Sequence, residues 1–394
     1  MKKTLVSLSL IAFFSMGVAA QADLTSDNYY NPLLTGVPSL SITPDATAGG
    51  MGDIGVSTLP DVSSQHWNSS KYALAESSAG IGLSYTPWLR KLVSDIDLAY
   101  LSGYYRNEKL GALSASLRYF SLGNVILKQT ANDPGIGAKP YELAFDLGYS
   151  RQLAENFAMG VTMRFIASDL SIKDENYHTG YGFSADVNGF YLLPIDLSSG
   201  TSKLGIGFNL SNIGTKISYD QDNTRNFIPA NLRLGATYYI PFDKYNRISV
   251  SAEANKLLVP TRKSKYAANF DANDQETWKL TDDEYNDISV MQGIFRSFND
   301  APSGGKEELK EIMWSLGLEY AYNEQFFARV GYCNESEDKG NRKFFTVGAG
   351  FKLSAFRFDL GYVIARAANS PLDNTLRFSL SFDVDGIREL ADRK

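Results

Sequence analysis

Apolar and polar residues alternate strictly in short segments along almost the whole chain, and this pattern restricts the fold more than any other feature. In "KLGIGFNLSNIG" one phase holds Leu204, Ile206, Phe208 and Leu210, and small or polar residues hold the other. The stretches "WSLGLEYAY", "AFRFDLGYVI" and "TLRFSLSF" repeat this arrangement towards the C-terminus. Successive side chains of a β-strand point to opposite faces, so each segment has one apolar and one polar face. The pattern predicts an all-β protein.

The length of the segments and the spacing between them indicate which β architecture is formed. We count about 14 segments, many of roughly ten residues, the length of a tilted strand that crosses a bilayer. They begin near residues 79, 95, 110, 142, 157, 181, 203, 229, 246, 311, 325, 343, 355 and 374. Short connections at 106–109, 154–156, 241–246 and 323–325 alternate with long ones at 122–141, 168–180, 214–228, 258–310, 334–342 and 366–373.

This alternation of loop lengths separates a membrane barrel from a soluble sandwich. Short turns on one rim and long loops on the other are typical of outer-membrane barrels. A soluble sandwich has the same period of two along its strands, but its fold does not require short and long loops to alternate along the chain. The sequence therefore predicts a transmembrane antiparallel β-barrel of about 14 strands, with both ends of the chain on the periplasmic side and the long loops outside.

The N-terminus has the features of a secretory signal peptide. Lys2 and Lys3 precede an apolar stretch at 5–18, and small residues stand at Ala20 and Ala22. We expect cleavage after Ala22, because the apolar stretch is short for a membrane-spanning helix. The expected organisation is a signal peptide (1–22), an N-terminal plug or hatch (23–78), the barrel (79–382, with the largest outer loop at 258–310) and a periplasmic tail (383–394).

Composition excludes several other functions. The mean hydropathy is only -0.21, as expected when lipid-facing apolar residues alternate with inward polar ones. Cys333 is the only cysteine and there are two histidines, so neither an intrachain disulfide nor a histidine-rich metal site is expected. A net charge of -6 argues against nucleic acid as a partner. The sequence lacks a G-x-S-x-G motif, and we expect neither an enzyme nor a cofactor. Asp271 and Asn273 begin like a calcium loop, but Glu276 stands where its turn glycine belongs, so a solvated acidic loop is preferred.

The glycine-rich stretch "DATAGGMGDIGVST" lies before the first expected strand. Barrels of about 16 to 18 strands leave an aqueous channel, whereas small barrels are filled by their own side chains. A barrel of intermediate size would leak if nothing closed it. Small residues allow close backbone packing inside a narrow bore, so the segment is predicted to be a plug with Met51, Trp67 and Asn68 as anchors. The alternative is a disordered periplasmic tail.

Charged residues of both signs occupy the inward phase of the expected strands. They are Arg118, Asp146, Arg164, Asp186, Glu319, Arg329, Arg357, Asp359 and Arg377. We interpret them as a network of paired charges that holds plug and wall together. The alternative is a path for ions or solutes, since polar lumens are common in barrels.

The largest outer loop contains an amphipathic pattern. Thr281 and Glu284 have the spacing of a capping box, which predicts a helix start. One apolar stripe follows, formed by Ile288, Met291, Ile294, Phe295 and Phe298. This stripe either folds over its own barrel mouth or binds a partner protein. Trp88, in "PWLRKLVSD", is expected to anchor in the membrane interface or to face a neighbouring barrel.

The N-terminal sequence resembles that of FadL-like outer-membrane barrels, and more closely that of the PorV (LptO) family. "ATAGGMGDIGVST" followed by "SSQHWNSSKYA" carries the likeness through Gly50-Met51-Gly52 and Trp67-Asn68. Ser69-Ser70 stands where the FadL-like pattern has Pro-Ala. The likeness covers almost the whole mature chain.

This resemblance implies a component of the type IX protein secretion system. It implies a cargo shuttle that docks on the SprA (Sov) translocon barrel, binds the C-terminal sorting domain of secreted proteins and delivers them to the PorU sortase complex. Contact with outer-membrane lipid and lipopolysaccharide is also expected. Two alternatives are a FadL-like transporter of hydrophobic small molecules and a structural porin-like barrel without partners.

Overall fold

The computed structural model describes residues 32–387 except 91–92, 94, 128–134, 173–176, 198–199, 221–224, 262–281, 302–303, 367–369 and 371. The predicted signal peptide, the calcium-like stretch at Asp271 and the capping residue Thr281 lie outside these residues. So do the first residues of the predicted plug and the end of the predicted tail.

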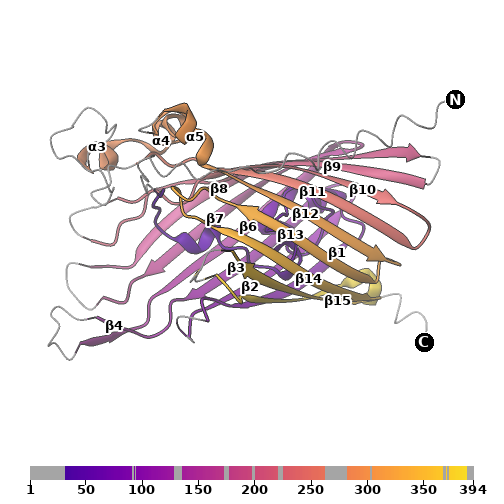
Figure 1. The fold of residues 1–394 in the computed structure, drawn as a ribbon, viewed down its shortest axis with the longest axis horizontal. Helices are drawn as coiled ribbons and strands as arrows, with labels where there is room; N and C mark the ends of the chain where they lie inside the picture. Colours follow the sequence, from indigo (N-terminus) through magenta and orange to yellow (C-terminus); the bar gives the residue numbers. More distant parts are fainter. Residues whose placement is uncertain are drawn as a thin grey trace.

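Fourteen antiparallel strands close into one barrel, as the sequence predicted (Figure 1). Strands that follow each other along the wall are paired, and β1 with β16 completes the circle. The largest error in a predicted strand start is three residues, at β9, which begins at Gly200 instead of 203. The strands are β1 (Ala79–Pro87), β2 (Asp97–Asn107), β3 (Gly111–Ser121), β6 (Tyr141–Ala154), β7 (Phe157–Asp169), β8 (Gly180–Leu197), β9 (Gly200–Gly214), β10 (Asn231–Pro241), β11 (Asn246–Leu257), β12 (Ile312–Tyr322), β13 (Phe326–Asn334), β14 (Lys343–Leu353), β15 (Phe356–Ala365) and β16 (Leu376–Asp383).

The connections are sorted between the two ends of the barrel, which we name the short-turn rim and the long-loop rim. Short turns at 108–110, 155–156, 242–245, 323–325 and 354–355 share one rim with the 198–199 connection. The connections at 198–199 and 354–355 were not among the short connections named from the sequence, although the strand starts after them were. On the long-loop rim, β4 (Val125–Leu127) and β5 (Ile136–Ala138) form a hairpin that the sequence analysis treated as irregular loop.

Apolar and polar side chains are distributed in the opposite way to those of a soluble protein. Along paired strands β10 and β11, Leu234 and Val250 are exposed on the outside, whereas Arg233 and Glu253 are buried on the inside. Exposed large apolar side chains and buried polar ones follow the same two phases around the barrel. This distribution suits a wall whose outer face contacts lipid.

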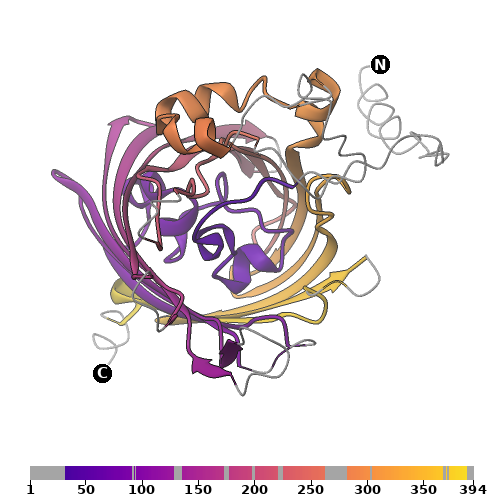
Figure 2. The same ribbon diagram turned by 90° about the vertical axis from the view of Figure 1, so that its left-hand side faces the viewer.

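The helices are short and lie on or inside this wall. Among the described residues, no helix has the length and apolar character needed to cross a lipid bilayer. Four short helices, η1 (Pro38–Ser41), α1 (Ala46–Gly49), α2 (Ser64–Trp67) and η2 (Ser69–Leu74), lie within the bore (Figure 2). The helices α3 (Asp282–Asp287), α4 (Val290–Arg296) and α5 (Gly305–Lys310) sit at the long-loop rim, and a helical turn at 384–387 follows β16 at the short-turn rim (Figure 1).

The prediction of one continuous apolar helix in the largest loop was wrong. The helix is divided between α3 and α4, because Ser289 has an extended backbone with a φ of -69° and a ψ of 157°. Ser289 and Gln292 form the capping box that starts α4. A serine that caps a new helix ends the preceding one, since an N-cap residue is not helical.

Candidate functional site

Residues 36–78, which we call the bore segment, approach the wall closely through their backbone at several glycines. A Cβ atom at Gly50 would lie 2.8 Å from the Cα of Gly348, and one at Gly331 would lie 2.1 Å from the nitrogen of Gly52. Gly52 also has a φ of +74°, a left-handed conformation that favours glycine. Glycines of the segment therefore face glycines of the wall, and no side chain separates the two backbones.

Side chains of the wall bond to the irregular backbone of the bore segment. Glu253 accepts hydrogen bonds from the backbone N–H groups of Gly55 and Val56, both at 3.0 Å. The Asn188 side chain accepts one from the backbone N–H of Ser70 at 2.8 Å. Buried backbone groups need partners, and single helical turns satisfy few of their own. The wall therefore supplies hydrogen-bond acceptors for backbone N–H groups that the short helices of the bore segment leave without a partner.

The three predicted anchors all lie buried in the bore. The indole N–H of Trp67 donates to the Asp45 carboxylate at 2.7 Å, and the Arg233 guanidinium lies 4.7 Å from the centre of the indole ring. The Asn68 amide donates to the carbonyl of Gly189 in the wall at 2.9 Å. Met51 lies against the wall backbone at Gly317. The geometry suits an anchoring role, which stays a prediction.

The predicted lumen charges lie inside the barrel, all of them buried except the partly exposed Arg357, but they form separate groups instead of one network. Arg164 pairs with Asp146 at 2.7 Å and with Asp186 at 3.1 Å. These three residues lie on adjacent strands of the wall, so this group holds the wall together.

A second group lies on β12, β13 and β15. Arg329 pairs with Glu319 at 2.7 Å and with Asp359 at 2.8 Å. Arg357 also pairs with Asp359 at 2.7 Å. The pairs of Arg329 join β13 to β12 and β15, whereas the pair of Arg357 with Asp359 lies within β15.

Only two of the predicted lumen charges contact the bore segment directly. Arg118 donates to the carbonyl of Ser39 at 2.6 Å, and Arg377 pairs with Asp53 at 2.8 Å. The sequence analysis missed Glu142, which accepts from the Ser39 N–H at 3.0 Å, as well as Arg233 and Glu253. Glu142 has the same phase as Asp146 on β6, so the alternation would have identified it.

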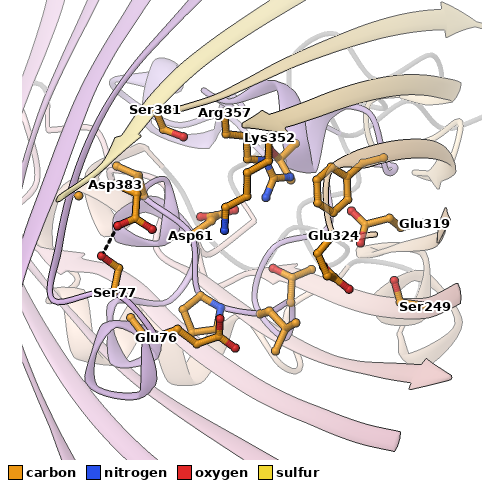
Figure 3. A pocket seen from close by; sticks show the side chains of 18 of the residues that line it. Asp61, Glu76, Ser77, Ser249, Glu319, Glu324, Lys352, Arg357, Ser381 and Asp383 are labelled. Carbon is orange, nitrogen blue, oxygen red and sulfur yellow. Dashed lines mark hydrogen bonds between the residues drawn. The ribbon is translucent and has the colours of Figure 1, made fainter. Parts of the chain in front are cut away.

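A cavity of about 580 Å³ lies between the bore segment and the strand ends at the short-turn rim (Figure 3). The segment contributes Asp61 and Glu76 to its lining. The wall contributes, among others, the charged residues Arg247, Glu319, Glu324, Lys352, Arg357 and Asp383. The lining also contains apolar side chains such as Leu192, Phe327 and Phe382, so charged and apolar groups are mixed along the cavity instead of forming the continuous apolar path that a fatty-acid conduit needs.

The α4 helix lies against the outer face of the barrel near the long-loop rim (Figure 2). Its buried residue Ile294 packs on Ala230 and Leu258, next to Leu210 and Leu232. Leu210 and Leu232 belong to the lipid-facing phase of β9 and β10, because Asn209 and Arg233 beside them face the bore.

The predicted apolar stripe is divided between two environments. Ile294 and Ile288 are buried, Ile288 in contact with Phe227, Val259 and Tyr285 at the barrel mouth. The exposed fractions of Met291, Phe295 and Phe298 are 53%, 71% and 50%. Trp88 is half-buried after β1, on the opposite side of the barrel from β10, and does not join this surface. We call Met291, Phe295 and Phe298 the α4 outer face.

A charged cluster attaches α5 to the wall beneath the α4 outer face. The Lys256 ammonium pairs with Glu311 at 2.6 Å and with Glu308 at 3.1 Å. Asp300, between α4 and α5, accepts from the N–H of Thr261 at 2.8 Å. Burial, together with the neighbouring charges of Glu311 and Glu308, raises the pKa of Asp300 to about 6.

The raised pKa of Asp300 predicts a pH-dependent attachment of α4 and α5. Because the folded-state pKa exceeds the ordinary value of 3.8, the folded form holds its proton better than the unfolded form. The stabilisation is present below that ordinary value and is lost as the pH rises through about 6. We expect larger protection factors, that is, slower amide hydrogen exchange after correction for its intrinsic pH dependence, in α4 and α5 at pH 5 than at pH 7.5. In Asp300→Asn the difference should disappear, and its persistence would assign the pH dependence to another group.

Comparison with known proteins gives one family match and several structural likenesses. The sequence model described as type IX secretion system protein PorV matches residues 24–264, more than half of the 394-residue chain. No curated protein matches the chain in sequence. The toluene transporter TodX of Pseudomonas putida has 12% identity and a TM-score of 0.48, with 85% of this chain and 96% of that chain covered. A Pseudomonas aeruginosa FadL homologue has 11% identity and a TM-score of 0.42, with 90% and 99% covered.

Proposed function

The chain belongs to the family of type IX secretion system protein PorV, and from that premise we propose that it is the cargo shuttle of this system. Family membership and the barrel fold make it an outer-membrane component of type IX secretion. We further propose the path that the secreted proteins follow. The protein docks beside a SprA-type translocon barrel, binds the C-terminal sorting domain of secreted proteins and passes them to a PorU-type sortase complex.

The observation that carries this proposal is the filled bore. Glycine backbones of the bore segment and the wall lie in direct contact at Gly50 and Gly331. Trp67 and Asn68 are fully buried between the segment and the wall. We therefore propose that the bore segment acts as a plug and that the protein acts through its outer surface. No catalytic activity is proposed.

We propose the α4 outer face as the surface that docks on the translocon. It carries three large exposed apolar side chains, and the buried side of α4 packs on the lipid-facing side of the wall at β9 and β10 and next to the end of β11. A partner that approaches within the plane of the membrane would meet this surface first. Aromatic residues are frequent among the side chains that dominate binding energy at interfaces.

Replacing Phe295 by aspartate is expected to abolish docking without unfolding the barrel. Phe295 is 71% exposed, so the charge remains hydrated in the free protein and becomes buried only in the complex. Loss of an interface anchor costs about 2 kcal/mol or more, roughly a 30-fold weaker association. The measurements are co-purification with the translocon barrel and the amount of cargo on the cell surface.

Two further variants show whether the effect is specific. Leu110→Asp places the same charge at a 70% exposed leucine on the short-turn rim and should leave docking and secretion intact. Ile294→Asp instead buries the charge against the barrel and should loosen α4, which limited proteolysis would detect. Normal secretion by Phe295→Asp would remove the α4 outer face from the mechanism.

Affinity purification from gently solubilised outer membranes tests the function as a whole. A shuttle should carry with it a large barrel and proteins that end in a sorting domain. A transporter of hydrophobic small molecules, the alternative, should instead bind a long-chain fatty acid saturably. Charged residues such as Arg247, Glu319 and Arg357 interrupt the apolar part of the lining of the 580 Å³ cavity, and this mixed lining favours the shuttle over a transporter with a continuous apolar path.

A further inference from the structure

We infer that the bore segment enters the barrel from the cell-surface end, so that residues around Leu34 are accessible outside the cell. Both ends of the wall, at β1 and β16, lie at the short-turn rim. That rim faces the periplasm in outer-membrane barrels. The sequence analysis expected the chain to start on the same side. The earliest described residues lie at the opposite rim.

The start of the segment is held by loops of the long-loop rim. The N–H of Gly36 donates to the carbonyl of Phe227 at 2.8 Å. Val37 and Leu40 are buried in one cluster with Ile217 and Ile228 of the loop between β9 and β10. The same cluster includes Ala144 and Ile166 at the loop-side ends of β6 and β7.

The end of the segment is held at the other rim. The Leu59 N–H donates to the hydroxyl of Tyr239, near the end of β10, at 2.7 Å. The Ser77 hydroxyl donates to Asp383 at 2.5 Å, where β16 ends. The Ser78 N–H donates to Asp385 at 2.7 Å. The segment therefore starts at the long-loop rim and ends at the short-turn rim, and between Leu59 and Ser77 it folds back far enough for His66 to share Arg118 with Ser39.

Because the bore segment starts at the long-loop rim, its first residues lie close to the outer helices α3 and α4. Phe227, which accepts from Gly36, contacts Tyr285 of α3 with ring centres 5.1 Å apart. A Cβ on Gly293 of α4 would lie 2.6 Å from the Phe227 ring. Leu34, two residues before Gly36, is 69% exposed. The start of the bore segment is therefore both a support for α3 and α4 and a part of the outer surface.

Cysteine labelling of intact cells tests this inference. Leu34→Cys changes an exposed side chain, and the native Cys333 is 1% exposed and should contribute little background. A membrane-impermeant maleimide is the probe. Lys139→Cys, in an exposed position of the long loop between β3 and β6, is the cell-surface control. Glu108→Cys, in the turn between β2 and β3, is the periplasmic control.

We expect Leu34→Cys to be labelled in intact cells to the same extent as Lys139→Cys, and Glu108→Cys only after the outer membrane is permeabilised. Labelling of Leu34→Cys only after permeabilisation would place the start of the segment in the periplasm and overturn the inference. Absence of labelling in both conditions would also overturn it, because Leu34 would then be covered. None of these outcomes depends on the shuttle proposal, which the co-purification experiments test separately.

Discussion

Replacing Arg164 by methionine is expected to lower the free energy of unfolding of the barrel by about 3–5 kcal/mol, the cost of removing one partner from a buried ion pair. Arg164 lies between Asp146 and Asp186, at 2.7 Å and 3.1 Å. The side chains of both aspartates are at most 7% exposed. Without the guanidinium, two like charges remain buried next to each other. Urea unfolding in lipid vesicles and the heat-dependent mobility of the barrel in gels measure the effect.

Two control variants separate the loss of the ion pairs from loss of side-chain volume. Adding Asp146→Asn and Asp186→Asn to Arg164→Met removes both buried charges and should recover most of the lost stability. Arg90→Met removes an ion pair with Asp97 whose side chains are 41% and 34% exposed. Exposed pairs contribute at most about 1 kcal/mol. The prediction would be contradicted if Arg164→Met lowered the free energy of unfolding no more than Arg90→Met does.

Replacing Gly331 by valine is expected to force the bore segment out of its position and to make the barrel conduct ions. The new Cβ would lie 2.1 Å from the backbone nitrogen of Gly52, and neither backbone has a flexible side chain that can move away. Overpacking of this kind costs typically about 1–3 kcal/mol or more. The measurements are single-channel conductance in planar bilayers and protease sensitivity of the segment.

Gly137→Val is the matched control, because a Cβ at Gly137 in β5 meets nothing within 4 Å. Valine suits both strand positions by propensity, so a difference between the two variants reports on packing alone. The unchanged protein should not conduct. If the Gly331→Val barrel does not conduct ions, or if the unchanged protein conducts them equally well, the segment does not close the bore.

The barrel could be predicted from the sequence because its determinants are local. Each strand carries its own alternation, and each turn or loop has its own length. The predicted starts of β1, β7, β11 and β14 coincide with the observed ones. The connections at 198–199 and 354–355, whose residues the sequence did not delimit, contain only two residues each.

The candidate site could be predicted only in part, because partners come from different strands and from the bore segment. The inward phase identified Arg164 and Arg329 as lumen residues but not their partners, which the strand register decides. The apolar stripe in the largest loop was visible, yet only the packing of Ile294 against Leu258 separates its buried residues from the exposed Phe295.

The sequence by itself determined the all-β class, the number and length of the strands, the polar bore and the family. These properties depend on the order and spacing of residues that are close in the chain, because the two faces of a strand follow from its period of two. Only the tertiary structure decided the direction of the bore segment, the grouping of the lumen charges and the position of α4 outside the wall. These properties depend on contacts such as Gly36 with Phe227 and Gly331 with Gly52, which join residues far apart in the chain.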